Sequence, residues 1–183
     1  ATASLNTRGI TPIQVLHDTG VLDAGVIIAH GNGIVDDDIP LLAAVRDRVG
    51  VTHGPKGYLK FAMGELTPIA ALRAAGVPVG YCTDGAASNN TLDIFENMRI
   101  TAITQKQIRN DATWFKSSMA LEMAGRSSAA VVGMRGQVGE LVVGGRADVI
   151  LVDTSGFHCQ PLHDLAAALV YSIQPTDVRT TIV

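Results

Sequence analysis

The sequence predicts an α/β protein built around a parallel β-sheet, and three short apolar runs predict it. The runs are Val26–His30, Val49–His53 and the beginning of Val77–Asn90. Each run is typical of a strand and ends near a titratable residue, which is His30, His53 or Asp84. A loop that contains glycine follows each of these residues, and a helical pattern follows each loop. Because the carboxyl ends of parallel strands meet at one edge of a sheet, these side chains are expected to share the face that carries active sites.

Asp84 is the central candidate among these residues. Val77, Val79 and Tyr81 alternate with smaller residues, and the loop after Asp84 consists of small and polar residues that leave the carboxylate uncovered. On this strand alone, a second interpretation stays open, in which Asp84 caps the following helix or shapes a turn. The coincidence of three strand ends favours a catalytic face.

Composition limits the classes of protein. Across 183 residues, 47% are hydrophobic, 17% are charged and 19 are glycines, which is typical of a buried parallel sheet with many turns. A formal charge of −3 gives no electrostatic reason to expect nucleic acid or a membrane surface as a partner. Cys82 and Cys159 form no CxxC pair, and neither a membrane span nor a signal peptide is evident, so a reducing cytoplasm is expected.

Helical patterns fill most of the remaining chain: Thr11–Thr19, Asp36–Val49, Thr67–Ala75, Leu92–Gln107, Thr113–Val132 and Leu162–Ser172. Leu92, Phe95, Met98 and Ile100 are expected to face inward, and the acids Asp36–Asp38 are expected to be solvated. His17, His158 and His163 are likewise expected to be surface or capping residues. The long loop 53–65 could wall a pocket with Lys56, Tyr58, Lys60 and Phe61.

The pattern changes at Gly136, where GQVGELVVGGRADVILVD alternates apolar runs with glycine turns and predicts a small β-layer. Val178–Val183 predicts a further strand. We therefore expect two parts, a sheet-and-helix part at residues 1–133 and a β-rich part with one helix at 134–183.

Several stretches resemble the amidohydrolase superfamily: AHGNGIVDDDIPLLA, HGPKGYLKFAMG, GYCTDGAASNNTLDIFENMR and VGELVVGGRADVILVD. The resemblance is strongest to the branch of methylthioadenosine/S-adenosylhomocysteine deaminases, guanine and other heterocycle deaminases, and triazine hydrolases. It implies the carboxyl-terminal part of a (β/α)₈ TIM-type barrel, with strands six to eight, plus part of a small β-sandwich. The first-strand His-x-His of the family is absent from this sequence, so an amino-terminal half and a few final residues are expected to be missing.

The resemblance also implies a site with one divalent metal, Zn²⁺ or alternatively Fe²⁺. Asp84 matches the family's metal-binding aspartate at the end of the eighth strand, and His30 matches its histidine at the end of the sixth. On chemical grounds both are expected to be catalytic, with Asp84 binding the metal and carrying a proton, and His30 polarising the hydroxide or carrying a proton. His53, Tyr58 and Asn89 are the expected substrate-binding residues. The chain departs from the family at two places in the loop after His53. Gly54 occupies a position where relatives often have asparagine, and Gly57-Tyr58 occupy positions where relatives often have serine-asparagine.

Three hypotheses of function follow. The first is a metal-dependent hydrolytic deaminase of an aminopurine nucleoside, such as methylthioadenosine, S-adenosylhomocysteine or adenosine. The second is an amidohydrolase acting on guanine, a pterin or a triazine, and the third is an inactive fragment or binding module. The expected partner is a small heterocyclic molecule, with homo-oligomerisation left open.

Overall fold

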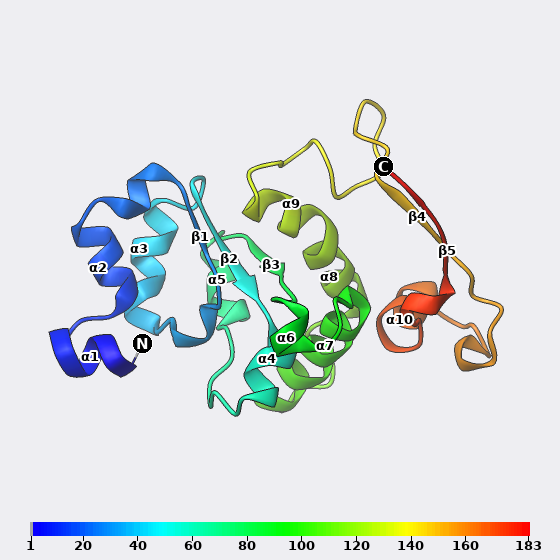
Figure 1. Cartoon of the computed structure of the whole chain (residues 1–183), viewed down its shortest axis with the longest axis horizontal. Coiled ribbons are helices and arrows are strands. Elements are labelled where there is room, and N and C mark those ends of the chain that lie inside the picture. Colours follow the sequence, from blue (N-terminus) through cyan, green and yellow to red (C-terminus); the bar gives the residue numbers. More distant parts are fainter. Residues whose placement is uncertain (1) are drawn as a thin grey trace.

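The computed structural model describes the backbone of residues 2–183 and the side chains of residues 4–183. A three-stranded parallel sheet lies among helices, and a two-stranded antiparallel sheet lies beyond them at one end of the molecule (Figure 1). From the amino terminus through the parallel sheet, the elements are α1 (Thr2–Arg8), α2 (Pro12–Asp18), β1 (Val26–Ile28), α3 (Ile39–Ala44), β2 (Val49–His53), α4 (Pro55–Lys60), α5 (Ile69–Ala74), β3 (Val79–Tyr81) and α6 (Ala86–Asn89).

The second half continues with α7 (Ile94–Arg109), α8 (Ser117–Glu122), the π-helical turn η4 (Met123–Ser127), α9 (Ser128–Val131), β4 (Val149–Val152), α10 (Leu165–Tyr171) and β5 (Val178–Ile182). Short 3₁₀ segments connect the elements: η1 (Val21–Ala24), η2 (Gly31–Gly33), η3 (Asp36–Asp38), η5 (Phe157–Cys159) and η6 (Pro175–Asp177).

The parallel sheet confirms the three predicted strands and their common direction. β1 pairs with β2, and β2 pairs with β3, with Val51 opposite both Ile28 and Val79. Val51 and Val79 are fully buried, as β-branched residues of a sheet covered by helices should be. Because all three strands run the same way, their carboxyl ends open onto one edge of the sheet.

Helix α2 begins and ends as its sequence predicts. The Thr11 hydroxyl accepts a hydrogen bond from the Gln14 backbone nitrogen at 3.0 Å, and Pro12 occupies the first helical position. Gly20 follows in the left-handed conformation, with φ of 73°. Thr11 also donates a hydrogen bond to the Asp38 carboxylate, which ties α2 to the start of α3.

The predicted helix Asp36–Val49 is wrong in length, and its acidic run is only partly solvated. The helix α3 ends at Ala44, because the chain must turn before Val49 enters β2. Asp38 is buried, since its carboxylate accepts hydrogen bonds from the Thr11 hydroxyl and the Val35 backbone nitrogen. Asp38 therefore stabilises a buried junction instead of facing water.

Helix α7 confirms most of the predicted run Leu92–Gln107. It begins after Asp93, whose carboxylate accepts a hydrogen bond from the Glu96 backbone nitrogen at 3.1 Å. Met98 is buried as expected, but Leu92 is 67% exposed. The expectation for Leu92 is wrong because this residue precedes the cap and so does not share the inward face of the helix.

Two glycines let α9 pack directly on the sheet. A methyl group added to Gly80 in β3 would lie 2.7 Å from the Ser128 hydroxyl oxygen and 2.9 Å from its Cα. A methyl group added to Gly50 in β2 would lie 2.6 Å from the Cα of Val131. Neighbouring Met123 is fully buried, which agrees with the prediction that the methionine-rich run packs in the core.

Substituting Gly80→Ala is expected to lower the free energy of unfolding by about 1–3 kcal/mol, because the added methyl group overpacks the contact between β3 and α9. Urea denaturation of the protein measures this change. Gly85→Ala is the matched control, because a methyl group there meets nothing within 4 Å and its φ is ordinary. Equal stability of the two variants would contradict the close packing.

The region after residue 136 confirms part of the predicted β-layer. β4 and β5 form an antiparallel pair with Val149 opposite Ile182, and α10 packs against α7 and α8. Within the described chain, residues 136–148 form turns and no strand, so that part of the prediction is wrong. No helix in residues 2–183 combines the length and apolarity that a membrane crossing requires.

Candidate active site

His30 and Asp84 come together at the carboxyl edge of the sheet. His30 lies two residues after Ile28 ends β1, and Asp84 lies three residues after Tyr81 ends β3. The His30 Nε2 atom is 3.3 Å from the Asp84 Oδ1 atom, and their side chains are 39% and 29% exposed. The two groups therefore form a partly solvated imidazole–carboxylate pair that a small molecule can reach.

The backbone is strained at both residues of this pair. His30 has φ of 67° and Asp84 has φ of 61°, in the left-handed region that residues with a Cβ rarely adopt. Such a conformation costs on the order of 1–3 kcal/mol and is concentrated at active sites and binding sites. Its occurrence at two strand ends that face each other supports a functional reason for their placement.

His53 lies at the same edge but deeper. Its side chain is fully buried, and neither ring nitrogen has a hydrogen-bond partner among the described residues. Burial lowers the pKa of His53 from 6.5 to about 3, so the ring is neutral at neutral pH. A neutral imidazole offers one donor and one acceptor, and here both are unused.

The buried His53 predicts a pH-dependent stability. The unfolded chain binds a proton at this ring near pH 6.5, whereas the folded chain does so only near pH 3. The neutral His53 ring therefore costs the folded protein no stability above pH 6.5. Below pH 6.5 the free energy of unfolding falls by about 1.4 kcal/mol per pH unit, because the unfolded chain binds the proton that the folded chain does not.

His53→Gln removes the titrating ring, so it provides the comparison. Urea denaturation at pH 7.5 and pH 5.5 measures the free energy of unfolding of the wild type and of this variant. Between pH 7.5 and pH 5.5, the wild type should lose more stability than the variant. An unchanged difference between the two proteins would show that the ring takes up its proton over the same pH range in the folded and the unfolded chain.

Tyr58 packs against both histidines. It lies on α4 with 2% of its surface exposed, and its ring meets His30 and His53 edge to face at centroid distances of 5.7 Å and 5.5 Å. Its hydroxyl donates to the Thr52 carbonyl oxygen at 3.4 Å, and burial raises its pKa. Tyr58 of the predicted pocket wall is thus buried against the two histidines, while Phe61 of the same predicted wall is 51% exposed.

Asn89 is buried at the end of α6 within a polar network. Its Oδ1 atom lies 3.2 Å from the Thr91 hydroxyl oxygen, which lies 2.8 Å from the Glu96 carboxylate and donates its one proton to one of these two acceptors. Lys56 completes the network through an ion pair with Glu96 at 2.6 Å. The amide nitrogen of Asn89 has no partner among the described residues, so this buried donor is unsatisfied.

Cys82 is the site residue that the sequence analysis missed. Its Sγ atom, a ring nitrogen of His30 and a carboxylate oxygen of Asp84 all lie within 4.8 Å of one another. Burial raises the pKa of the Cys82 thiol, and the thiol is free. Its position in the sequence could have revealed it, because Cys82 directly follows the third strand and precedes Asp84 by two residues.

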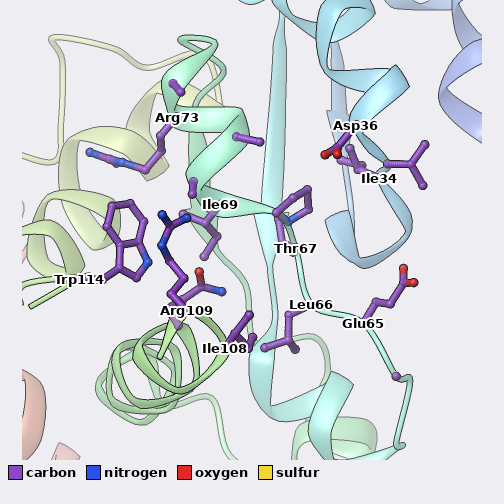
Figure 2. A pocket seen from close by; sticks show the side chains of 17 residues that line it. Ile34, Asp36, Glu65, Leu66, Thr67, Ile69, Arg73, Ile108, Arg109 and Trp114 are labelled. Carbon is purple, nitrogen blue, oxygen red and sulfur yellow. The ribbon is translucent and has the colours of Figure 1, made fainter. Parts of the chain in front are cut away.

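A separate cavity of about 1210 Å³ lies between α5 and the end of α7. Figure 2 shows Arg109 and Trp114 on one side of it, Ile69 and Thr67 near its middle and Asp36 on the far side. None of the predicted site residues lines this cavity. It carries no catalytic constellation, so the candidate active site is the edge occupied by His30, His53 and Asp84.

Comparison with known proteins identifies the class of protein. Residues 4–183 match the model of the Amidohydrolase family, and the chain therefore belongs to that family. The 5-methylthioadenosine/S-adenosylhomocysteine deaminase of Desulforudis audaxviator is 42% identical over 175 residues, which cover 96% of this chain and 40% of that relative. The deaminase of the same name from Haloarcula marismortui is 37% identical over 181 residues, covering 99% and 41%.

Solved structures agree with this assignment. An adenosine deaminase from Xanthomonas campestris with bound zinc matches with a TM-score of 0.91 at 32% identity, over 100% of this chain and 41% of that one. Atrazine chlorohydrolase from Arthrobacter aurescens, complexed with zinc, matches with a TM-score of 0.89 at 28% identity, over 100% and 40%. The chain thus spans about 40% of the length of these relatives and forms the carboxyl-terminal part of a TIM-type barrel with part of a small β-sandwich.

Proposed function

We propose that this chain supplies the carboxyl-terminal strand ends of the active site in a metal-dependent hydrolytic deaminase of an aminopurine nucleoside. The observation that carries the proposal is the contact of 3.3 Å between His30 and Asp84, each on a strained backbone at a strand end. The deaminases that match nearly the whole chain support the reaction type. In this proposal residues 1–133 form the barrel part and residues 134–183 the sandwich part.

The Asp84 carboxylate fits a metal ligand. It is partly buried, and among the described residues it receives no hydrogen bond from a backbone nitrogen, so its oxygen lone pairs are available. A hard carboxylate oxygen suits Zn²⁺ and Fe²⁺, and the zinc named in two similar structures favours Zn²⁺. When bound, the metal would activate water for hydrolysis at neutral pH.

In the proposed mechanism, Asp84 and His30 move protons. The second carboxylate oxygen of Asp84 accepts the proton of the attacking water and passes it to the ring nitrogen or to the leaving amine. His30 lies beside this carboxylate, and histidine is the side chain that most often transfers protons in catalysis. The contact tightens from 3.3 Å to hydrogen-bond distance as the proton moves.

His53, Tyr58 and Asn89 are the proposed substrate-binding residues. The two unused ring nitrogens of His53 and the unused amide nitrogen of Asn89 are buried polar groups that a heterocycle could satisfy. Tyr58 packs edge to face against both histidines, so its displacement would expose their rings to a ligand. These three side chains are proposed to recognise the base, with Tyr58 controlling access.

The test is release of ammonia from 5′-methylthioadenosine, S-adenosylhomocysteine and adenosine by the protein at its natural length. We expect ammonia from at least one of them and markedly slower hydrolysis of guanine, a pterin or a chlorotriazine. The triazine reaction is the second candidate, because a triazine-hydrolysing enzyme has nearly the same fold match. Chloride release from a triazine without ammonia release from the nucleosides would favour that candidate and overturn ours.

A further inference from the structure

Helix α4 lies beside the candidate active site, although it has only six residues. A methyl group added to Gly57 would lie 3.5 Å from the Asp84 Oδ2 atom, so the backbone of the helix faces this carboxylate. The next residue, Tyr58, packs its ring against His30 and His53. A helix this short gains little stability from its own backbone hydrogen bonds, so contacts with other elements must hold it in place.

Lys60 joins the end of α4 to the end of α6. Its ammonium group donates hydrogen bonds to the Ser88 carbonyl oxygen at 2.7 Å and to the Asn90 Oδ1 atom at 2.6 Å. These two residues flank Asn89, whose buried amide nitrogen has no partner among the described residues. Lys60 therefore binds the backbone that carries a proposed substrate-binding residue.

Lys56 joins the beginning of α4 to the segment that leads into α7. Its ammonium group lies 2.6 Å from the Glu96 Oε2 atom and 2.9 Å from the Thr91 hydroxyl oxygen, and its side chain is 19% exposed. Thr91 lies in turn 3.2 Å from the Asn89 Oδ1 atom, so this contact extends to the same asparagine. Breaking a shielded ion pair costs more than breaking an exposed one, because the remaining charge has less water around it.

The two lysines act on one contact between segments. They lie one helical turn apart on α4, both bind residues of the segment 88–96, and α4 contacts α6 and α7 (Figure 1). Among the described residues, neither ammonium group forms a hydrogen bond or an ion pair with His30 or Asp84. Their effect on the site must therefore pass through the segments that they join.

We propose that Lys56 and Lys60 are positioning residues, which hold α4 against the segment 88–96 and so keep Tyr58 and Asn89 in the arrangement that binds the substrate. This inference rests on the proposed function, because Tyr58 and Asn89 are its substrate-binding residues. Two lysines on a helix of six residues give this arrangement four polar contacts between segments that are far apart in the sequence.

The proposal predicts a rise in KM with little change in kcat. The ends of β1 and β3 place His30 and Asp84, and the lysines do not contact these side chains. Lys56→Met keeps the apolar stem but removes the ammonium group. It should raise KM about tenfold or more and leave kcat within about threefold, because hydrogen bonds from a charged group are lost outside the reacting pair.

The first measurement is the steady-state kinetics of the protein at its natural length, with 5′-methylthioadenosine, S-adenosylhomocysteine and adenosine as substrates. Lys56→Arg keeps a positive charge and hydrogen-bond donors, so it should restore KM to within about threefold of the wild type. Lys60→Met gives a second test with a low risk of unfolding, because Lys60 is exposed. Lys116→Met is the matched control, since the Lys116 side chain forms no ion pair and no helix cap in the described chain, and it should leave KM unchanged.

The second measurement is hydrogen exchange, which needs no substrate. In Lys56→Met and Lys60→Met, amides of residues 53–65 and 86–91 should exchange about tenfold or more faster, because opening of α4 becomes easier. Amides of α10 should exchange at the wild-type rate, which also shows that each variant is folded. Lys116→Met should leave the exchange of residues 53–65 and 86–91 unchanged.

The outcomes separate this inference from the proposed function. An unchanged KM in both methionine variants, or an equal rise in Lys116→Met, overturns the positioning role, and unchanged exchange of α4 in both overturns the hold on the helix. A fall in kcat of about 10²-fold or more at unchanged KM places the lysines in the proton transfers and also overturns it. Failure of the proposed function has a different signature: the wild type releases no ammonia from the three nucleosides, while hydrogen exchange still decides whether the lysines hold α4.

Discussion

Replacing Asp84 with asparagine is expected to reduce turnover by about 10⁴-fold or more, as removal of one member of a catalytic unit does. Asparagine keeps the size of the side chain but loses the negative charge for the metal and the basicity for the proton. It also tolerates the left-handed backbone at this position, where φ is 61°, so the fold should survive. Steady-state assays and metal analysis of the purified variant measure both losses.

Asp93→Asn is the matched control for this substitution. Asp93 caps α7 through a hydrogen bond from the Glu96 backbone nitrogen, and asparagine caps helices equally well. This control should keep its activity and its metal. Near-normal activity in Asp84→Asn, or an equal loss in Asp93→Asn, would end the claim that Asp84 is the central residue.

Replacing His30 with asparagine is expected to lower kcat by about 10²–10⁴-fold, the usual contribution of a positioned proton carrier. The metal content should stay near that of the wild type, because His30 is proposed to move protons and not to bind the metal. Asparagine again suits the local backbone, where φ is 67°.

His17→Asn is the control for this second substitution, because His17 is exposed on α2 and, among the described residues, its ring forms a hydrogen bond only with the neighbouring Asp18 carboxylate. It should leave kcat unchanged. Loss of stoichiometric metal in His30→Asn would instead identify His30 as a ligand, and the proposed division of roles would then be incorrect.

The fold was predictable where short-range chemistry determines it. The Thr11 cap and Gly20 fix α2 from the sequence alone, and the β-branched runs before His53 and Asp84 predict the strands. The prediction failed where contacts between residues far apart in the sequence determine whether a side chain is buried. The burial of Asp38 depends on a hydrogen bond from Thr11, 27 residues away, which no periodicity reveals.

The candidate site shows the same division. Parallel strand ends predict that His30 and Asp84 meet, and the structure brings them to 3.3 Å. The sequence does not reveal that the Tyr58 ring contacts both His30 and His53, because helix α4, which forms in the predicted loop 53–65, sets that position. Cys82 was missed because its residue type suggested strand packing, whereas its direction places the sulfur beside Asp84.

The most direct test of the account is to locate the metal by anomalous diffraction at the zinc edge, in crystals of the protein at its natural length. We predict an anomalous peak about 2.0–2.2 Å from a carboxylate oxygen of Asp84. A zinc ion bound elsewhere, for example between His158 and Asp177, with the Asp84 carboxylate free, would contradict the proposed active site.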